Sequence, residues 1–191
     1  MQPLPSSFPL VAAVAELAEL LPAVAALAPQ LEAVGKALVD SWASGGKLLT
    51  CGNGGSAADA MHFAEELVVR FQKDRRALAA IALHDPTVLT CAGNDLGYAR
   101  VFSRQVEALG RRGDVLAVFT TSGNSENILL AVEVAHGLGM TTVAFLGRDG
   151  GKLRGVCKHE LLVPAGTSHR TQEAHLLLYH SLCQWLDAQF D

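Results

Sequence analysis

Residues 47–71 of the 191-residue chain read KLLTCGNGGSAADAMHFAEELVVRF, and this stretch decides the fold class. The apolar run at 47–51 predicts a short strand buried on both faces, because its apolar residues are continuous rather than alternating. A glycine-rich loop follows, and the residues from about Ser56 to Phe71 are numerous enough to form a helix. A strand, a tight loop and a helix in this order are typical of a parallel sheet covered by helices.

The same order recurs along the rest of the chain. Further apolar runs predict strands at 78–83, 114–119, 141–146 and 160–163. Helices are predicted at 125–138 and 171–190, and Asp85-Pro86 is a good N-cap and first-turn pair for another helix. We therefore predict an α/β fold, in which helices flank a five-stranded parallel sheet on both faces.

An apolar helical region precedes the first strand. Residues 10–42 have apolar positions at helical spacing, and Pro22 and Pro29 are expected to split or kink the helix. Few charges occur before Lys36, and an arm this apolar more often packs against another subunit than against water. We expect residues 1–45 to be an N-terminal helical arm for oligomerisation and residues 46–191 to be a single domain.

The composition limits the function classes. A net charge of −4 gives no electrostatic basis for binding nucleic acid. The four cysteines include no CxxC pair, which favours a reducing compartment over a disulfide framework. Glu16 and Glu19 interrupt the apolar N-terminus, which makes it a poor signal peptide, and no apolar run reaches the length of a membrane span. We expect a soluble, cytoplasmic protein without a membrane partner.

Two loops have the composition of phosphate-binding sites. Residues 51–56 read CGNGGS and residues 120–125 read TTSGNS, and each loop directly precedes a predicted helix. Glycines allow a ligand to approach the backbone closely. A helix N-terminus offers free N–H groups to an anion, and the serine and threonine hydroxyls beside it can bind the same anion. Either loop alone is equally well a tight turn with a capping serine. Because both are expected at the carboxyl edge of one sheet, together they favour phosphate binding.

Two pairs of polar residues predict a metal or acid–base site less directly. His62 and Glu66 lie four residues apart on one predicted helix, and Gln172 and His180 lie eight apart on another. Imidazole, carboxylate and amide groups can bind a divalent ion such as zinc. A histidine and a glutamate at this spacing are, however, more often a surface ion pair or a core histidine with its partner.

Several long motifs, in the same order, resemble one family. They are CGNGGSAADAMHFAEEL, GND with FSRQVEALGRRGDVL, TTSGNSENILLA, GRDGGKL and TQEAHLLLYHSLC. Together they resemble the phosphoheptose isomerases of the SIS (sugar isomerase) superfamily, from about residue 46 to residue 191. The resemblance implies a SIS-type, flavodoxin-like fold. It also implies an aldose–ketose isomerase that converts sedoheptulose 7-phosphate to D-glycero-D-manno-heptose 7-phosphate through an enediol, and a homotetramer with sites at subunit interfaces.

The resemblance also implies roles for particular residues. Glu66 and His180 would transfer the protons, in an order that stays open, and Glu66 is preferred over Glu65 because it shares a helix face with His62. One zinc ion per subunit would be held by His62, Glu66, Gln172 and His180. The sugar phosphate would be bound by Asn53, Gly54, Ser56, Asp95, Thr120, Thr121, Ser122, Ser125 and Gln172.

Other histidines have plainer interpretations. His136 and His159 are expected to face solvent, His175 to support the site from behind, and His84 is a candidate substrate contact. His169 stands where some relatives carry an aspartate that contacts the sugar, which affects the expected sugar specificity more than the reaction type. Thr120 replaces a serine common in the family's phosphate loop but keeps the hydroxyl.

Two alternative functions stay open. SIS proteins without the catalytic pair bind the bacterial replication initiator, and this chain differs from them in having Glu66 and His180 together with His62 and Gln172. The second alternative is an isomerase for another phosphosugar, such as an aminosugar phosphate, on the same scaffold.

Overall fold

A five-stranded parallel sheet forms the centre of the computed structural model, which describes residues 8–190. The strand order is β2-β1-β3-β4-β5, and each neighbouring pair is parallel. The strands are β1 (Leu48–Gly52), β2 (Ala80–Ala82), β3 (Val115–Thr120), β4 (Thr141–Gly147) and β5 (His159–Val163). The predicted five-stranded parallel sheet is confirmed, and this order is the flavodoxin-like one, whose switch point lies between β1 and β3.

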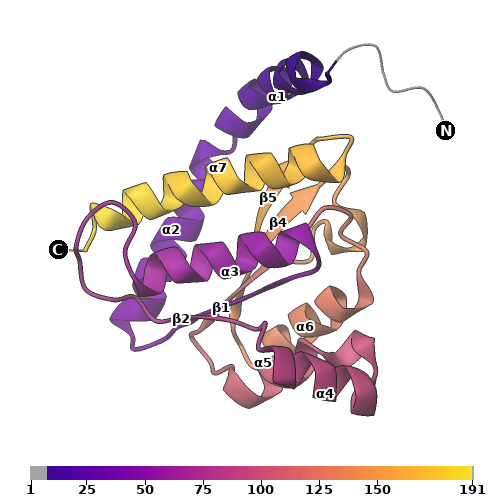
Figure 1. The fold of residues 1–191 in the computed structure, drawn as a ribbon. Coiled ribbons are helices and arrows are strands. Elements are labelled where there is room, and N and C mark those ends of the chain that lie inside the picture. The colour runs from indigo at the N-terminus through magenta and orange to yellow at the C-terminus, as the bar shows by residue number, and fades with distance from the viewer. Residues whose placement is uncertain (1–7, 191) are drawn as a thin grey trace.

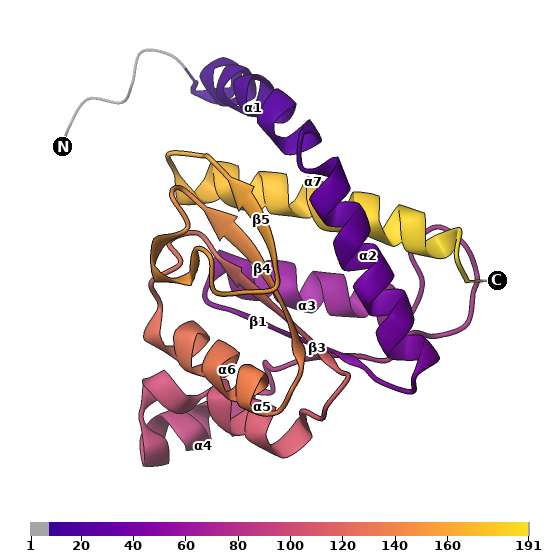
Figure 2. The ribbon, with the colours of Figure 1, turned by 180° about the vertical axis from the view of Figure 1, so that it is seen from behind.

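Helices cover both faces of the sheet, as Figures 1 and 2 show from opposite sides. The seven α-helices of the described chain are α1 (Leu10–Ala25), α2 (Ala28–Ala43), α3 (Gly55–Val68), α4 (Pro86–Leu96), α5 (Ser103–Leu109), α6 (Glu126–Gly137) and α7 (Ser168–Asp187). Helices α2, α3 and α7 pack on one face, and α4, α5 and α6 on the other. The three-layer sandwich is therefore confirmed.

The continuous apolar strands divide into two cores. In β3, Val115, Ala117 and Phe119 face the α2–α3–α7 layer, whereas Leu116 and Val118 face the α4–α5–α6 layer. Successive side chains of a strand point to opposite faces, so a strand covered on both sides needs apolar residues at every position.

Helix α1 extends away from the sandwich, past the start of α7 (Figures 1 and 2). The helical arm breaks after Ala25 rather than at Pro22, which lies inside the last turns of α1, and Pro29 lies in the first turn of α2. The helical region is therefore split as predicted, with α1 and α2 bent by 63° at a break between the two prolines, although Pro22 itself lies inside α1. Pro29 lies in the first turn of α2, where its missing N–H costs nothing. Residues 1–7 of the predicted arm and residue 191 of the predicted domain lie outside the described part.

Within residues 8–190, no single helix is long and apolar enough to cross a membrane; α1 and α2 pass that test only as a pair bent by 63°.

Some element boundaries differ from the prediction. Helix α3 ends at Val68 rather than at Phe71, and α7 begins at Ser168 rather than at Thr171. Helix α5 and the short 3₁₀ helix Tyr98–Arg100 were not predicted. These elements are too short for an apolar period to show in the sequence.

Candidate active site

A cavity of about 220 Å³ lies at the carboxyl edge of the sheet, where β1 and β3 end. Its lining is Asn53, Ser56, Phe119, Thr120, Thr121, Ser122, Ser125, Ser168 and Gln172. This set brings together every predicted substrate-binding residue except Gly54 and Asp95. Phe119 and Ser168 also line the cavity but were not predicted to do so. Ser168 was missed because the last helix was predicted to begin only at residue 171.

The cavity lies at the switch point of the sheet because the loops after β1 and β3 turn to opposite faces. Helices α3 and α6 begin directly after these loops, so their free N–H groups lie at this edge. All nine lining residues are uncharged. The cavity therefore offers an anion hydroxyls, amides and helix N-termini in place of lysine or arginine.

Side-chain hydroxyls shape the loop after β3. Thr120 accepts a hydrogen bond from the backbone N–H of Gly123 at 3.1 Å, and Ser122 accepts one from that of Asn124 at 3.2 Å. The Thr121 hydroxyl lies 3.0 Å from that of Ser168 at the start of α7, which ties the two walls of the cavity together. The Thr120 hydroxyl therefore has a structural use in closing this loop.

Two predicted substrate residues lie outside this lining. Gly54 is exposed in the turn before α3, with a φ of +59° that favours glycine. Asp95 is exposed on α4, where its carboxylate accepts hydrogen bonds from Asn94 and Cys91. Asp95 is not among the residues that line the cavity.

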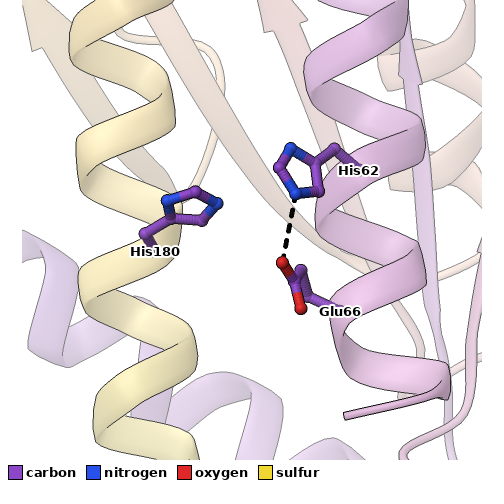
Figure 3. Close-up of side chains that lie close together, drawn as sticks. All are labelled: His62, Glu66 and His180. Carbon is purple, nitrogen blue, oxygen red and sulfur yellow. Dashed lines mark hydrogen bonds and ion pairs between the residues drawn. The ribbon is translucent and has the colours of Figure 1, made fainter. Parts of the chain in front are cut away.

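Three other predicted residues meet between α3 and α7 (Figure 3). The ligand-bearing atoms of His62, Glu66 and His180 all lie within 4.8 Å of one another. His62 Nε2 is 3.1 Å from Glu66 Oε1, and the ring centroids of His62 and His180 are 5.0 Å apart. We call these three residues the His–Glu–His cluster. Glu65, the rejected alternative, is exposed.

The cluster suits a divalent cation. His180 Nε2 is buried and has no hydrogen-bond partner among residues 8–190, which leaves a nitrogen lone pair or N–H unused. Burial and the neighbouring His62 lower the pKa of His180, and Glu66 opposes this shift. A neutral imidazole beside a second imidazole and a carboxylate is the donor set that zinc prefers.

Gln172 lies apart from this cluster. It is eight residues before His180 on α7, which is about 12 Å along a helix axis. Its amide lies against Gly55, where a Cβ would come within 2.5 Å of Gln172 Nε2, so a side chain at position 55 would displace the Gln172 amide. The structure therefore groups three of the four predicted metal ligands and places Gln172 in the cavity lining.

Sequence reasoning missed Tyr179, which supports the cluster. Its hydroxyl is 2.9 Å from His62 Nδ1, while the ring is 1% exposed and packs among aromatic core residues. Asp59, one turn before His62, was also missed: its Oδ2 is buried without a partner in the described chain, and burial raises its pKa to about 6, against the influence of His62. Neither residue has a recognisable spacing motif, so no sequence signal pointed to them.

Four of the five remaining histidines have a hydrogen-bond partner within residues 8–190. His84 contacts the backbone oxygen of Gly52 at 2.9 Å through Nε2 and does not line the cavity. His175 is fully buried, and its Nε2–H donates to the carbonyl of Leu146. His136 is exposed, as expected, whereas His159 is only partly exposed and its Nε2 is buried. His169 is exposed at the start of α7, beside Thr167.

Comparisons with known proteins agree with the fold and the cavity. The family model described as "SIS domain" matches residues 14–147, so the fold and its phosphate-type loops define a SIS-domain protein. Phosphoheptose isomerases of Aeromonas hydrophila and Vibrio cholerae are 52% identical over 160 residues and 50% identical over 161 residues. The alignments cover 83% of this chain and 83% of the Aeromonas protein, and 84% of each for Vibrio.

Solved structures of the same kind superpose closely. The phosphoheptose isomerase of Neisseria gonorrhoeae has a TM-score of 0.87 and 42% identity, covering 94% of this chain and 97% of that one. That of Francisella tularensis has a TM-score of 0.86 and 39% identity, covering 95% and 100%. The chain belongs to the phosphoheptose isomerase family.

Proposed function

We propose that the protein is an aldose–ketose isomerase that converts sedoheptulose 7-phosphate to D-glycero-D-manno-heptose 7-phosphate, a precursor for lipopolysaccharide. One observation carries this proposal: Glu66 on α3 and His180 on α7 lie close together, and both helices begin at the cavity lined by the loops after β1 and β3. Membership of the phosphoheptose isomerase family supports the same reaction.

In this proposal the cavity binds the phosphate. Ser56, Thr120, Ser122 and Ser125 offer hydroxyls there, and α3 and α6 offer their N-terminal N–H groups. Ser56 and His62 are six residues apart on α3, which is about 9 Å along the axis. An extended seven-carbon chain has a similar reach from its terminal phosphate to its first two carbons. The separation of cavity and cluster therefore favours a long-chain sugar phosphate.

Isomerisation requires moving a proton from C1 to C2 and another between the two oxygens, through an enediol. Glu66 would take the proton from C1 and return it to C2, while His180 would carry the proton between O1 and O2, or the two roles would be exchanged. The low pKa of His180 favours the neutral imidazole, which can accept and then donate a proton near neutral pH.

We further propose one zinc ion per subunit as cofactor, held by His62, Glu66 and His180; Gln172, expected as a fourth ligand, lies in the cavity lining instead. The unpartnered Nε2 of His180 and the closeness of the three donor groups support this assignment. When bound, zinc would polarise the substrate carbonyl and stabilise the developing oxyanion. The chain's own residues orient the sugar from the phosphate end and hold the two proton carriers.

We also propose that the protein is a homotetramer and is cytoplasmic. The exposed apolar side chains of α1 support residues 1–45 as an oligomerisation arm beside a domain at 46–191, in a homotetramer with sites at subunit interfaces. Its partner would be a small sugar phosphate rather than nucleic acid or a membrane. The four free cysteines of the described chain support a cytoplasmic location.

An isomerase assay tests the function. Purified protein with sedoheptulose 7-phosphate and added zinc is expected to form the aldoheptose phosphate, followed by NMR. Glu66→Gln and His180→Gln should each lower kcat by at least about 10³-fold with the fold intact, because each removes a proton carrier. Glu65→Gln, a change of the same type at the neighbouring exposed carboxylate, should keep wild-type turnover.

The outcome separates the alternatives. Full activity in both Glu66→Gln and His180→Gln would overturn the assignment of the proton carriers. Turnover of an aminosugar phosphate but not of the ketoheptose phosphate would move the proposal to another phosphosugar. Absence of any isomerase activity, with binding to the replication initiator, would favour the non-catalytic alternative.

A further inference from the structure

A buried ion pair joins the far ends of the two helices that carry the His–Glu–His cluster. Arg75 follows α3 in the chain, and Asp187 is the last residue of α7. Arg75 Nε lies 3.0 Å from Asp187 Oδ1, and the two side chains are only 0% and 3% exposed. Removing two charges from water costs free energy that their mutual attraction alone often does not offset. The other contacts of Arg75 and Asp187 therefore matter for the role of the pair.

Arg75 holds the end of α3 directly. Its guanidinium donates to the backbone carbonyl of Glu66 at 2.9 Å, and also to those of Leu67 at 2.9 Å and Arg76 at 3.0 Å. The last carbonyls of a helix lack hydrogen-bond donors within the helix. Here the side chain of Arg75, from the loop after α3, supplies these donors. The backbone of a cluster residue is thus fixed by Arg75.

Asp187 holds the same loop from the other side. Its Oδ2 accepts hydrogen bonds from the backbone N–H groups of Gln72 at 2.8 Å and Lys73 at 3.1 Å. Although burial by itself raises the pKa of Asp187, these hydrogen bonds and the Arg75 charge lower it below its ordinary value. Asp187 lies seven residues after His180, which is about two turns, and therefore on the same side of α7.

We infer that the Arg75–Asp187 pair is a positioning device that sets the separation of Glu66 and His180 across the α3–α7 interface; this inference rests on the proposed function. The pair connects the backbone of Glu66 to the helix that bears His180. Metal–ligand distances tolerate changes of only about 0.2 Å, and a misplacement of about 1 Å costs roughly 10²-fold in rate. Neither Arg75 nor Asp187 lines the cavity or belongs to the cluster, so we expect them to act through the helices.

The test compares two buried carboxylates with similar partners. Asp187→Asn removes the negative charge from the Arg75–Asp187 pair. Asp114→Asn is the matched control, because Asp114 is also buried and also accepts from a cation, Lys47, and from backbone N–H groups, those of Lys47 and Arg111. Asp114 lies just before β3, at the amino edge of the sheet and away from the cluster.

Three experiments are done on each folded protein. Chelator competition gives the Zn²⁺ dissociation constant, absorption spectroscopy gives the Co²⁺ spectrum, and steady-state kinetics give kcat and KM for sedoheptulose 7-phosphate. Both variants should be less resistant to urea. Only Asp187→Asn is expected to weaken Zn²⁺ binding by about 10- to 100-fold, change the Co²⁺ spectrum and lower kcat by about 10²-fold. KM should change little, because the phosphate cavity lies at the other end of both helices.

Wild-type Zn²⁺ affinity, Co²⁺ spectrum and kcat in Asp187→Asn would overturn the inference and leave the pair a purely stabilising one. If Asp187→Asn does not fold, Arg75→Lys replaces it, since lysine keeps the charge but cannot donate to Asp187 and three carbonyls together. An inactive wild-type protein would instead count against the proposed function, and the Zn²⁺ and Co²⁺ measurements would still decide the positioning role.

Discussion

Both ring nitrogens of His62 have partners, and these partners come from different helices. Nε2 lies beside Glu66 on α3, and Nδ1 lies beside the Tyr179 hydroxyl on α7. A histidine held at one nitrogen presents the other in a fixed direction, which is the usual arrangement behind metal-binding histidines. Tyr179 is thus the residue-scale link between the aromatic core and the His–Glu–His cluster.

Tyr179→Phe is expected to weaken Zn²⁺ binding by about 10- to 100-fold, because it removes the hydrogen bond that orients His62. The fold should survive, since phenylalanine keeps the contacts of the ring with Phe63 and Phe119. Chelator competition measures the affinity. Tyr98→Phe is the control, because Tyr98 also loses a hydrogen bond, to Asn53, but lies outside the cluster. Equal affinities in both variants would contradict the role of Tyr179.

His175 should make stability depend on pH. Burial lowers its pKa to about 4, and the hydrogen bond to the Leu146 carbonyl only partly opposes this. The unfolded chain takes up the proton near its ordinary pKa of about 6.5, before the folded protein does. The contribution of this group to stability is therefore fully present above that pH and is lost as the pH falls toward 4.

His175→Gln should flatten this dependence, because glutamine can still donate to Leu146 but does not titrate. The pKa shift corresponds to about 3 kcal/mol of unfolding free energy between pH 6.5 and pH 4. Urea unfolding at a series of pH values measures it. The exposed His136→Gln should retain the wild-type slope, and a wild-type slope in His175→Gln would show that other groups cause the acid sensitivity.

At the scale of elements, the loop between β3 and α6 depends on one glycine. Gly123 has a φ of +63°, and a Cβ there would overlap the carbonyl oxygen of Gly150 in the neighbouring loop. The Gly123 N–H also closes the loop onto Thr120. A side chain at this position must therefore move the loop that lines the cavity.

Gly123→Ala is expected to raise KM for the sugar phosphate by at least about tenfold, because the displaced hydroxyls no longer converge on the phosphate. Steady-state kinetics measure the change. Gly45→Ala is a matched control: its φ is +78°, but a Cβ there meets nothing within 4 Å. That control should cost about 1–2 kcal/mol of stability for the left-handed backbone without altering KM. An unchanged KM in Gly123→Ala would contradict the proposed phosphate site.

At the scale of the whole molecule, α1 is too apolar for the contacts it makes within one chain. Leu10, Val11 and Val14 are 60%, 82% and 59% exposed, although the helix packs against α7 near its C-terminal end. An exposed apolar stripe on a projecting helix marks an interface. A second copy of the chain is the partner that the proposed homotetramer requires.

The double substitution Val11→Glu and Val14→Glu is expected to dissociate the proposed homotetramer, because it would place charges in the interface formed by α1. Sedimentation velocity measures the mass, and urea unfolding should show that the α/β sandwich is retained. Val156→Glu, another exposed apolar position, lies before β5 and should leave the mass unchanged. A double variant that sediments like the wild-type protein would contradict the role of the arm.

The sequence by itself determined the sheet and most, but not all, of the cavity lining. The continuous apolar runs predicted all five strands, because burial on both faces requires apolar residues at every position. The sequence also predicted that the loops at 51–56 and 120–125 lie together, because the carboxyl ends of parallel strands meet at one edge of the sheet. Such features are local in sequence, and one chain shows them directly.

Only the tertiary structure decided which distant side chains meet. Tyr179 beside His62, Arg75 beside Asp187 and Gln172 against Gly55 are contacts between residues more than a hundred positions apart, and no spacing encodes them. The packing of α3 along α7 creates all three. That packing depends on side-chain shapes across an interface, which neither local propensity nor apolar periodicity records.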